Sequence, residues 1–347
     1  MIRIAIVGTG GMANSHAHEF QKIKGCKIVA VCDVDTARAA AFAEKYHVKR
    51  HFSNLTDMLN GAESDAVSIV TPDSTHAKLG LQAVAAGQHV LCEKPLAANY
   101  PDALKMARAA ARKGVINMIN FSYRNASAIQ KAASILASGE LGQVVHVHGS
   151  YLQSWLSSKV WGDWKTSPAW LWRLSSSHGS RGVLGDVGVH LLDFATFPVG
   201  PAKNIGAKLK VFSAIKGKSM SGYTLDANDS ALITLEFAGG ALASLHTSRW
   251  ATGHSNSVSL IIHAEHGAIR VDLDKSNTQL EICRGKDVDT CTWKTLDCGR
   301  TPSIYERFVQ SIRTGINDQP DFARGAEIQK LLDACYTSNE SGTTVKV

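Results

Sequence analysis

The sequence predicts an α/β protein of two domains, a doubly wound parallel sheet followed by an α+β domain with an open, mostly antiparallel sheet. Up to about residue 122, short apolar runs alternate with helical patterns, which is typical of βαβ units. Beyond this point, longer segments alternate apolar and polar residues, as strands do when one face of a sheet meets solvent. We therefore expect domains at 1–122 and 123–347.

The elements of the first domain follow this alternation. The run Ile-Arg-Ile-Ala-Ile-Val at 2–7 is rich in β-branched residues, which favours a buried strand. Gly87 and Gly114 each end a helical pattern, because glycine readily closes a helix. The expected strands span 2–7, 27–32, 66–70, 89–92 and 115–120, and the expected helices span 14–22, 37–46, 76–86 and 100–113.

The second domain combines helical patterns with the alternating strand pattern. The pair Gly239-Gly240 lies between two strand patterns and predicts a hairpin turn. The expected strands span 143–152, 207–214, 229–237, 241–249, 257–264, 268–273 and 279–283, with helices at 128–138, 305–314 and 324–338 on one face of the sheet.

The composition fits a globular protein with substantial cores, because 44% of the 347 residues are hydrophobic and 19% are charged. The net charge of +7 favours anionic ligands such as a dinucleotide, or reflects only a mildly basic surface, but no Lys/Arg run indicates nucleic-acid binding. No apolar run reaches membrane-spanning length and the chain starts directly on a strand, so we expect a cytoplasmic protein without membrane partners. The seven cysteines form no C-x-x-C motif and are expected to be reduced thiols.

A glycine-rich turn joins the first strand to the first helix. Gly8-Thr9-Gly10-Gly11-Met12-Ala13 is a G-x-G-x-x-A motif, and Asp33 follows the second strand. In this context the motif is the dinucleotide-binding fingerprint. Gly8 permits the tight turn, Gly10 lets the backbone approach a pyrophosphate, and the helix N-terminus attracts its negative charge. The sequence therefore predicts a bound NAD or NADP.

Further polar segments follow the other parallel strands, at 71–76 and 93–95. Ligands of such sheets bind beyond the carboxyl ends of the strands, so we expect these segments to converge on the cofactor. Lys94 directly follows a buried strand and would project into the same crevice, where it could assist proton transfer. The alternative is a surface lysine in a turn.

The segment 185–194 is predicted to be a largely buried helix. Asp186, His190 and Asp193 fall at i, i+4 and i+7 and would share one face. His190 could be a general base that carboxylates orient, or a core histidine next to a capping aspartate.

Five tryptophans cluster in an irregular region, at positions 155, 161, 164, 170 and 172. Their flat apolar rings suit the C–H faces of a sugar, a subunit interface or simple packing. Arg173 follows the cluster and could hold a phosphate or a hydroxyl-rich ligand.

Taken together, these motifs resemble the glucose-fructose oxidoreductase and inositol dehydrogenase family, called Gfo/Idh/MocA. The resemblance covers nearly the whole chain, and its carriers are the segments 8–13, 71–76, 93–95 and 185–193. It implies a Rossmann domain, a cis bond before Pro95 and a homodimer or homotetramer that pairs through the open sheet. It also implies that Lys94, His190 and Asp186 are catalytic, without a metal ion.

The resemblance further assigns binding roles by position. The cofactor would be lined by Gly8, Thr9, Gly10, Gly11, Met12, Asp33, Val34, Arg38, Thr71, Pro72, Asp73, His76, Glu93, Lys94 and Asn120, and reached by Trp172, Arg173 and Tyr305. The substrate would contact Lys94, Arg124, Arg173, Asp186 and His190.

The expected activity is hydride transfer between NAD(H) and a secondary alcohol or ketone of a sugar, anhydrosugar or cyclitol. Asp33 would accept hydrogen bonds from the ribose hydroxyls and repel a 2′-phosphate, which favours NAD, whereas Arg38 could bind that phosphate in NADP. Two alternatives stay open. One is an NAD-dependent glycoside-cleaving enzyme that oxidises its sugar transiently, and the other is a non-catalytic dinucleotide-binding regulator.

Overall fold

The computed structural model describes residues 1–212 and 216–347. These residues form two compact units, one of Met1–Ser122 with Pro302–Gln329 and one of Tyr123–Thr301 with Lys330–Val347. The segment 302–329, which the sequence analysis placed with the second domain, thus packs in the first unit. Local patterns mark where the type of sheet changes, but they do not show that the chain later returns to the earlier sheet.

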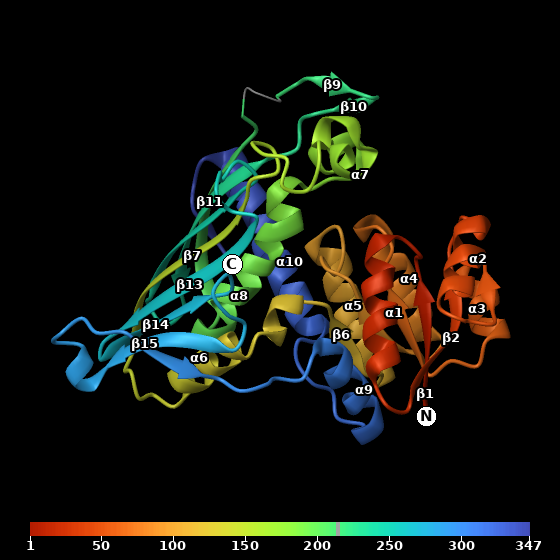
Figure 1. Ribbon diagram of the computed structural model, residues 1–347, viewed down its shortest axis with the longest axis horizontal. Coiled ribbons are helices and arrows are strands. Elements are labelled where there is room, and N and C mark those ends of the chain that lie inside the picture. Colours follow the sequence, from red (N-terminus) through yellow and green to blue (C-terminus); the bar gives the residue numbers. More distant parts are fainter. Residues whose placement is uncertain (213–215) are drawn as a thin grey trace. The chain divides into compact units, whose positions relative to one another are not determined.

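The first unit is built on a six-stranded parallel sheet in the order β3-β2-β1-β4-β5-β6 (Figure 1). The sheet order reverses direction between β1 and β4, which is the switch point where doubly wound sheets bind ligands. The strands are β1 (Ile2–Val7), β2 (Cys26–Cys32), β3 (His51–Phe52), β4 (Ala66–Ile69), β5 (His89–Cys92) and β6 (Asn117–Ile119). The two-residue edge strand β3 was not predicted, because it is too short to carry a pattern.

Several helices of the first unit begin at a residue whose side chain caps the helix N-terminus. Asp35 caps α2, Asn99 caps α5, and Ser303 and Glu306 form a capping box at α9. Helix α9 packs against α1, and α4 packs against α5. The helices are α1 (Gly11–Lys22), α2 (Thr36–Lys45), α3 (Leu55–Gly61), α4 (Asp73–Ala85), α5 (Tyr100–Lys113) and α9 (Ile304–Thr314).

The second unit contains a nine-stranded sheet in the order β16-β15-β14-β13-β7-β12-β11-β8-β17. Every neighbouring pair is antiparallel except β7 and β12, which are parallel, so the strand predicted at 143–152 is antiparallel on one side only. The strand predicted at 207–214 begins earlier, and residues 213 and 214 lie outside the described part of the chain. The strands are β7 (Val144–Gln153), β8 (Ala202–Lys210), β11 (Ser230–Phe237), β12 (Leu242–Ser248), β13 (Asn256–Ala264), β14 (Gly267–Asp272), β15 (Gln279–Arg284), β16 (Lys294–Asp297) and β17 (Val345–Lys346).

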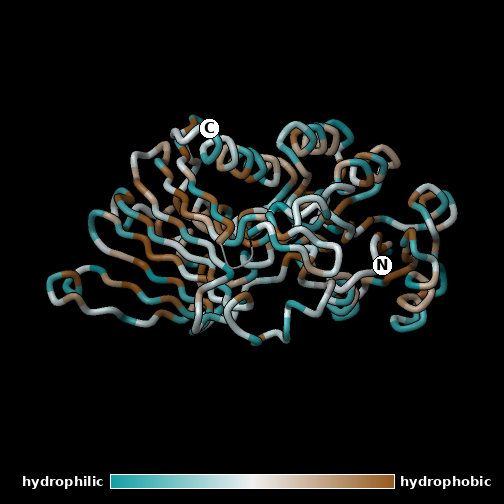
Figure 2. Tube along the Cα trace, turned by 90° about the horizontal axis from the view of Figure 1, so that it is seen from above, coloured by the Kyte–Doolittle hydropathy of each residue, from teal (hydrophilic) through white to brown (hydrophobic). Residues whose placement is uncertain are grey.

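Helices cover one face of this sheet and leave the other face open. A Cβ at Gly149 of β7 would lie 2.9 Å from both Leu245 and Leu260 and 3.3 Å from Leu191, so the central strand lies close beneath α8 (Val189–Val199). Leu232 and Leu242 point to the other face, where they are 60% and 53% exposed. Hydropathy alternates along these strands accordingly (Figure 2).

Other helices of the second unit are α6 (Ser127–Ala137), α7 (Pro168–Leu171) and the part of α10 (Phe322–Ser341) from residue 330 onward. Strands β9 (Ser219–Met220) and β10 (Tyr223–Thr224) form a separate hairpin. Within the described ranges, no helix is long and apolar enough to cross a membrane.

Candidate active site

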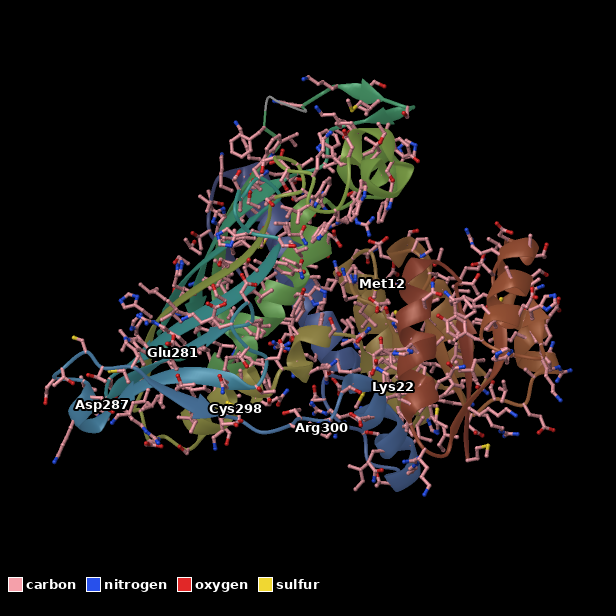
Figure 3. All side chains as sticks on the ribbon, in the orientation of Figure 1. Met12, Lys22, Glu281, Asp287, Cys298 and Arg300 are labelled. Atoms are coloured by element: carbon pink, nitrogen blue, oxygen red, sulfur yellow. The ribbon has the colours of Figure 1, made fainter. Side chains whose placement is uncertain are left out.

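The glycine turn after β1 has the geometry that its sequence predicts. Gly8 has φ +92°, and a Cβ there would lie 2.7 Å from the carbonyl oxygen of Val70, so only glycine fits. A Cβ at Gly10 or Gly11 would meet no atom within 4 Å, so packing within the chain does not require glycine at either position. Helix α1 starts here without a side-chain cap, and Figure 3 labels Met12 and Lys22 at its two ends. Bare backbone and uncapped N–H groups fit the pyrophosphate of a dinucleotide.

Asp33 lies at the end of β2 and accepts hydrogen bonds at both carboxylate oxygens. The backbone N–H and hydroxyl of Thr9 donate at 2.8 Å each, the N–H of Asp35 donates at 3.0 Å, and Arg38 donates from Nε at 3.2 Å and Nη2 at 2.7 Å. Burial alone would raise the pKa of Asp33, but these donors outweigh it and lower the pKa to about 2. The two residues predicted to select the cofactor therefore form one ion pair, next to the exposed Val34.

The segment after β4 is tied to the Lys94-Pro95 turn. His76 is buried, with Nδ1 2.8 Å from the carbonyl oxygen of Pro95 and Nε2 2.8 Å from that of Thr71. Pro72 stands at the N-cap of α4, and Asp73 begins the helix. The His76 ring thus connects the loop after β4 with the loop after β5, and it is itself buried.

Glu93 ends β5 and is the centre of a buried hydrogen-bond network. Its Oε1 lies 2.9 Å from His16 Nε2 and accepts from Asn120 Nδ2 at 2.6 Å, and its Oε2 accepts from the backbone N–H of Lys94 at 3.2 Å. Burial alone would raise the pKa of Glu93, but interactions with His16, Lys94 and Asn120 lower it to about 2. Lys94 is half-buried and precedes Pro95 through a cis bond.

Tyr305 completes this network from the returning segment. Asn120 Nδ2 also donates to the Tyr305 hydroxyl at 3.1 Å, and the Tyr305 ring packs edge-on against His16 with centroids 4.9 Å apart. Burial and the nearby Glu93 carboxylate raise the pKa of Tyr305, so it stays a neutral phenol. The buried Oδ1 of Asn120 has no hydrogen-bond partner among the described residues, and a donor such as the carboxamide of a nicotinamide would satisfy it.

Asp186 and His190 belong to the second unit, but their backbone is not a regular helix. A π-turn at Leu184–Gly188 carries Asp186, and α8 carries His190 and Asp193. The extra residue in a π-turn changes the angular spacing on which the sequence prediction of one shared face relied. Asp186 is 30% exposed, whereas His190 and Asp193 are buried.

Asp193 and Arg124 form a buried ion pair. Arg124 donates from Nε at 2.7 Å and from Nη2 at 2.6 Å, and its guanidinium lies over the ring of Phe197. The structure therefore gives Arg124, a predicted substrate ligand, a partner inside the core of the second unit.

Two tyrosines, which no local sequence pattern indicates, pack beside His190. Tyr123 packs edge-on with its ring centroid 4.9 Å from that of His190, and the two tyrosine hydroxyls of Tyr123 and Tyr151 are 2.5 Å apart. Asn256 accepts from the Tyr151 hydroxyl at 2.9 Å and donates to the Tyr123 hydroxyl at 2.9 Å. Burial raises the pKa of Tyr151, so His190 faces a neutral, hydroxyl-rich wall.

Asp186 is held by two guanidinium groups. Arg249 Nη2 donates to Asp186 Oδ2 at 3.1 Å, and Arg173 Nε lies 3.6 Å from the same oxygen. Arg173 also lies over the rings of Trp170 and Trp172. No local pattern in the sequence indicates the contribution of Arg249.

The tryptophan cluster serves mainly for packing. Trp155 and Trp164 are buried in one apolar cluster, and Trp161 and Trp170 pack against it. Trp172 differs because its side chain is 39% exposed. Of the three interpretations offered by the sequence, packing thus accounts for four of the rings, and Trp172 retains a face for a ligand or a partner.

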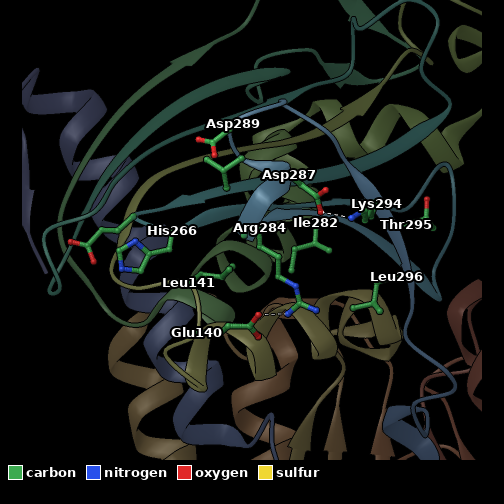
Figure 4. A pocket seen from close by; sticks show the side chains of 13 residues that line it. Glu140, Leu141, His266, Ile282, Arg284, Asp287, Asp289, Lys294, Thr295 and Leu296 are labelled. Carbon is green, nitrogen blue, oxygen red and sulfur yellow. Dashed lines mark hydrogen bonds and ion pairs between the residues drawn. The ribbon is translucent and has the colours of Figure 1, made fainter.

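A hollow of about 880 Å³ lies at the β15–β16 end of the second unit (Figure 4). Two ion pairs lie in its lining, between Arg284 and Glu140 and between Lys294 and Asp287. None of the predicted site residues lines it, so it is not the candidate active site. Over the described ranges, no group of three or more His, Cys, Asp or Glu could hold a metal ion.

Comparison with known proteins identifies both units. Residues 2–121 match the profile of an oxidoreductase family with an NAD-binding Rossmann fold, and residues 129–270 match the C-terminal domain of the Gfo/Idh/MocA proteins. The chain belongs to the Gfo/Idh/MocA family. It is therefore an oxidoreductase whose first unit is an NAD-binding Rossmann domain, as the sequence analysis predicted.

Relatives of full length occur within this family. The chain is 24% identical to levoglucosan dehydrogenase of Pseudarthrobacter phenanthrenivorans, and the match covers 100% of this chain and 98% of that protein. It is 27% identical to D-glucoside 3-dehydrogenase of Escherichia coli, and the match covers 100% of this chain and 97% of that protein. The crystal structure of an oxidoreductase domain protein from Kribbella flavida superimposes with a TM-score of 0.90 at 26% identity, over 100% of both chains. A structure of levoglucosan dehydrogenase with NADH and levoglucosan has the same fold, with a TM-score of 0.89 at 24% identity over 100% of this chain and 99% of that one.

Proposed function

We propose that the protein is an NAD-dependent dehydrogenase that oxidises a secondary alcohol of a sugar, anhydrosugar or cyclitol, or reduces the matching ketone. The observation that carries the proposal is the cluster in the second unit, where the rings of His190, Tyr123 and Tyr151 pack together and His190 follows the ion-paired Asp186 by one turn. Its alternating donors and acceptors suit a ligand with several hydroxyl groups. Relatives named levoglucosan dehydrogenase and inositol 2-dehydrogenase act on such compounds.

Each proposed catalytic residue has a role that follows from its chemistry. Bound NAD would supply the acceptor for the hydride of the carbinol carbon. His190 takes the hydroxyl proton as general base, and Lys94 donates a hydrogen bond to the same oxygen to stabilise its developing negative charge. Asp186 orients the substrate or tunes His190. The Glu93 network holds the backbone of Lys94 in place.

Among the cofactor ligands, the glycine turn and Asn120 have the strongest support from the structure. Gly8 to Met12 would hold the pyrophosphate, Asp33 the adenosine ribose, and Asn120 Oδ1 the nicotinamide side. Trp172 and Arg173 are proposed to contact substrate or cofactor from the second unit. His76, Glu93 and Tyr305 are proposed to act by positioning these loops.

The test is a screen for NAD reduction across sugars, anhydrosugars and cyclitols, followed at 340 nm. We expect net NADH formation with at least one compound and no comparable rate with simple primary alcohols. Consumption of a glycoside without net NADH would instead indicate the glycoside-cleaving alternative. No turnover, combined with tight NAD binding, would favour a regulator and overturn the proposal.

We also propose that the protein is a cytoplasmic homodimer or homotetramer that pairs through the open sheet face. Leu232 and Leu242 on that face are more than half exposed, and burial of such side chains favours association. All seven cysteines are free, which agrees with a reducing compartment. Sedimentation should give a dimer or tetramer and, for the variant with both Leu232→Glu and Leu242→Glu, a monomer. A monomeric wild type would contradict the assembly.

A further inference from the structure

Arg249 directly follows β12 and is fully buried. Its Nη1 donates to the carbonyl oxygen of Arg173 at 2.8 Å, its Nη2 donates to Asp186 Oδ2 at 3.1 Å, and its guanidinium lies over the ring of Trp155. One side chain thus links the tryptophan cluster, the Arg173 segment and the π-turn that carries Asp186.

Connecting these segments through a buried guanidinium costs free energy, because the charged side chain loses its contact with water. Burial lowers the pKa of Arg249, and its Nε has no partner among the described residues. Apolar side chains of similar volume often stabilise a core as well as a buried ion pair does, or better. Packing alone therefore does not explain an arginine at this position, whereas a requirement for its charge at Asp186 does.

The groups that face Asp186 come from several elements. Arg173 approaches Oδ2 from the segment after α7, Arg249 reaches the same oxygen from the end of β12, and Tyr151 of β7 is close enough for the carboxylate to raise its pKa. His190 follows one turn later in α8. Two guanidinium groups on one oxygen stabilise its negative charge and limit its rotation.

We propose that Arg249 is a positioning residue that fixes the Asp186 carboxylate beside His190, and that it supports catalysis only through Asp186. The inference rests on the proposed dehydrogenase function and deepens it. Arg249 itself is too buried to touch substrate. Its loss leaves Arg173 as the remaining guanidinium of the pair on the carboxylate, so the carboxylate rotates more freely and less of its negative charge is offset. We expect this to raise the pH at which His190 becomes protonated.

The test is a double-mutant cycle with Arg249→Met and Asp186→Asn, using the substrate found in the screen. We expect Arg249→Met to lower kcat/KM by about 10- to 100-fold in the wild-type background and by less than about 3-fold in the Asp186→Asn background. The acid limb of kcat/KM should move to higher pH in Arg249→Met. Arg249→Lys, which retains a cation, should restore part of that displacement.

Equal losses in both backgrounds, or an acid limb that does not move, would overturn the proposal. Arg307→Met is the matched control, because Arg307 forms a two-bond ion pair with Asp318 in the first unit, at 2.7 and 2.9 Å. Arg307→Met should lower thermal stability without changing the pH profile of kcat/KM.

If Arg249→Met does not fold, Arg249→Lys with and without Asp186→Asn gives the same comparison. A wild type that oxidises no sugar refutes the proposed function, whereas an active wild type with additive losses refutes only this inference.

Discussion

Two carboxylates, one in each unit, are held next to a proposed catalytic residue by different means. Glu93 precedes Lys94 and is held by an amide, an imidazole and a backbone N–H. Asp186 precedes His190 by one turn and is held by two guanidinium groups. Glu93 is buried, whereas Asp186 is 30% exposed.

This difference indicates different tasks. The donors around Glu93 come from α1 and from the ends of neighbouring strands of one sheet, so that carboxylate is rigid and serves as a support. Asp186 reaches solvent and can meet a ligand, but in the proposed mechanism its negative charge would favour protonation of the base His190. Two neighbouring guanidinium groups offset that effect, so Asp186 is held by arginines, whereas Glu93 is held by an amide, an imidazole and a backbone N–H.

The largest expected effect on catalysis comes from replacing Lys94, which follows Glu93, or His190, which follows Asp186 by one turn. Lys94→Ala and His190→Ala should each lower kcat by about 10²- to 10⁴-fold, because each removes a group that interacts with the reacting oxygen. NAD affinity, measured by fluorescence titration, should change little in His190→Ala. Near-normal kcat in either variant would show that its carboxylate supports something other than catalysis.

A smaller effect concerns pH and the stability of the first unit. The pKa of Glu93 in the folded protein is about 2, below its ordinary value of 4.5. The ionised Glu93 side chain contributes fully to the free energy of unfolding above about pH 4.5. This contribution is lost as the pH falls from about 4.5 to about 2, with a slope of up to about 1.4 kcal/mol per pH unit. Glu93→Gln should be less stable at pH 7 and should lose less stability between pH 4.5 and 2.

Chemical denaturation at several pH values measures this difference. The exposed Glu44 on α2 provides the control, and Glu44→Gln should retain the pH dependence of the wild type. Parallel curves for wild type and Glu93→Gln would mean that the network around Glu93 does not stabilise its ionised form.

The smallest expected effect concerns Arg38, an exposed arginine that can be compared with the buried Arg249. Arg38 pairs with Asp33 as Arg249 pairs with Asp186, but its side chain is 51% exposed. Arg38→Ala should therefore change the free energy of unfolding by less than about 1 kcal/mol. We expect kcat/KM for NADP to fall by about 10-fold, since one charge-assisted contact is lost, and that for NAD to change by less than about 3-fold. An equal loss with both cofactors would show that Arg38 only positions Asp33.

Sequence reasoning located those parts of the site that depend on local patterns. The Gly8 turn, Asp33 and the place of Lys94 at a strand end follow directly from neighbouring residues, whereas the cis bond before Pro95 followed from the resemblance to the family. His16, Tyr151 and Arg249 were missed, because these partners lie 28 to 63 positions away in the chain and no local spacing reports them. The π-turn was also missed, since one extra residue per turn leaves no periodic trace in so short a segment.

The return of residues 302–329 to the first unit determines how that unit can be isolated. Asn120 and Tyr305 are 185 positions apart in the chain but share a hydrogen bond. A fragment that stops at residue 122 would lack α9 and would expose the apolar side of α1 that α9 covers. A stand-alone cofactor-binding module would have to join both stretches by a short linker, and any exchange of this module between proteins must carry the two pieces together.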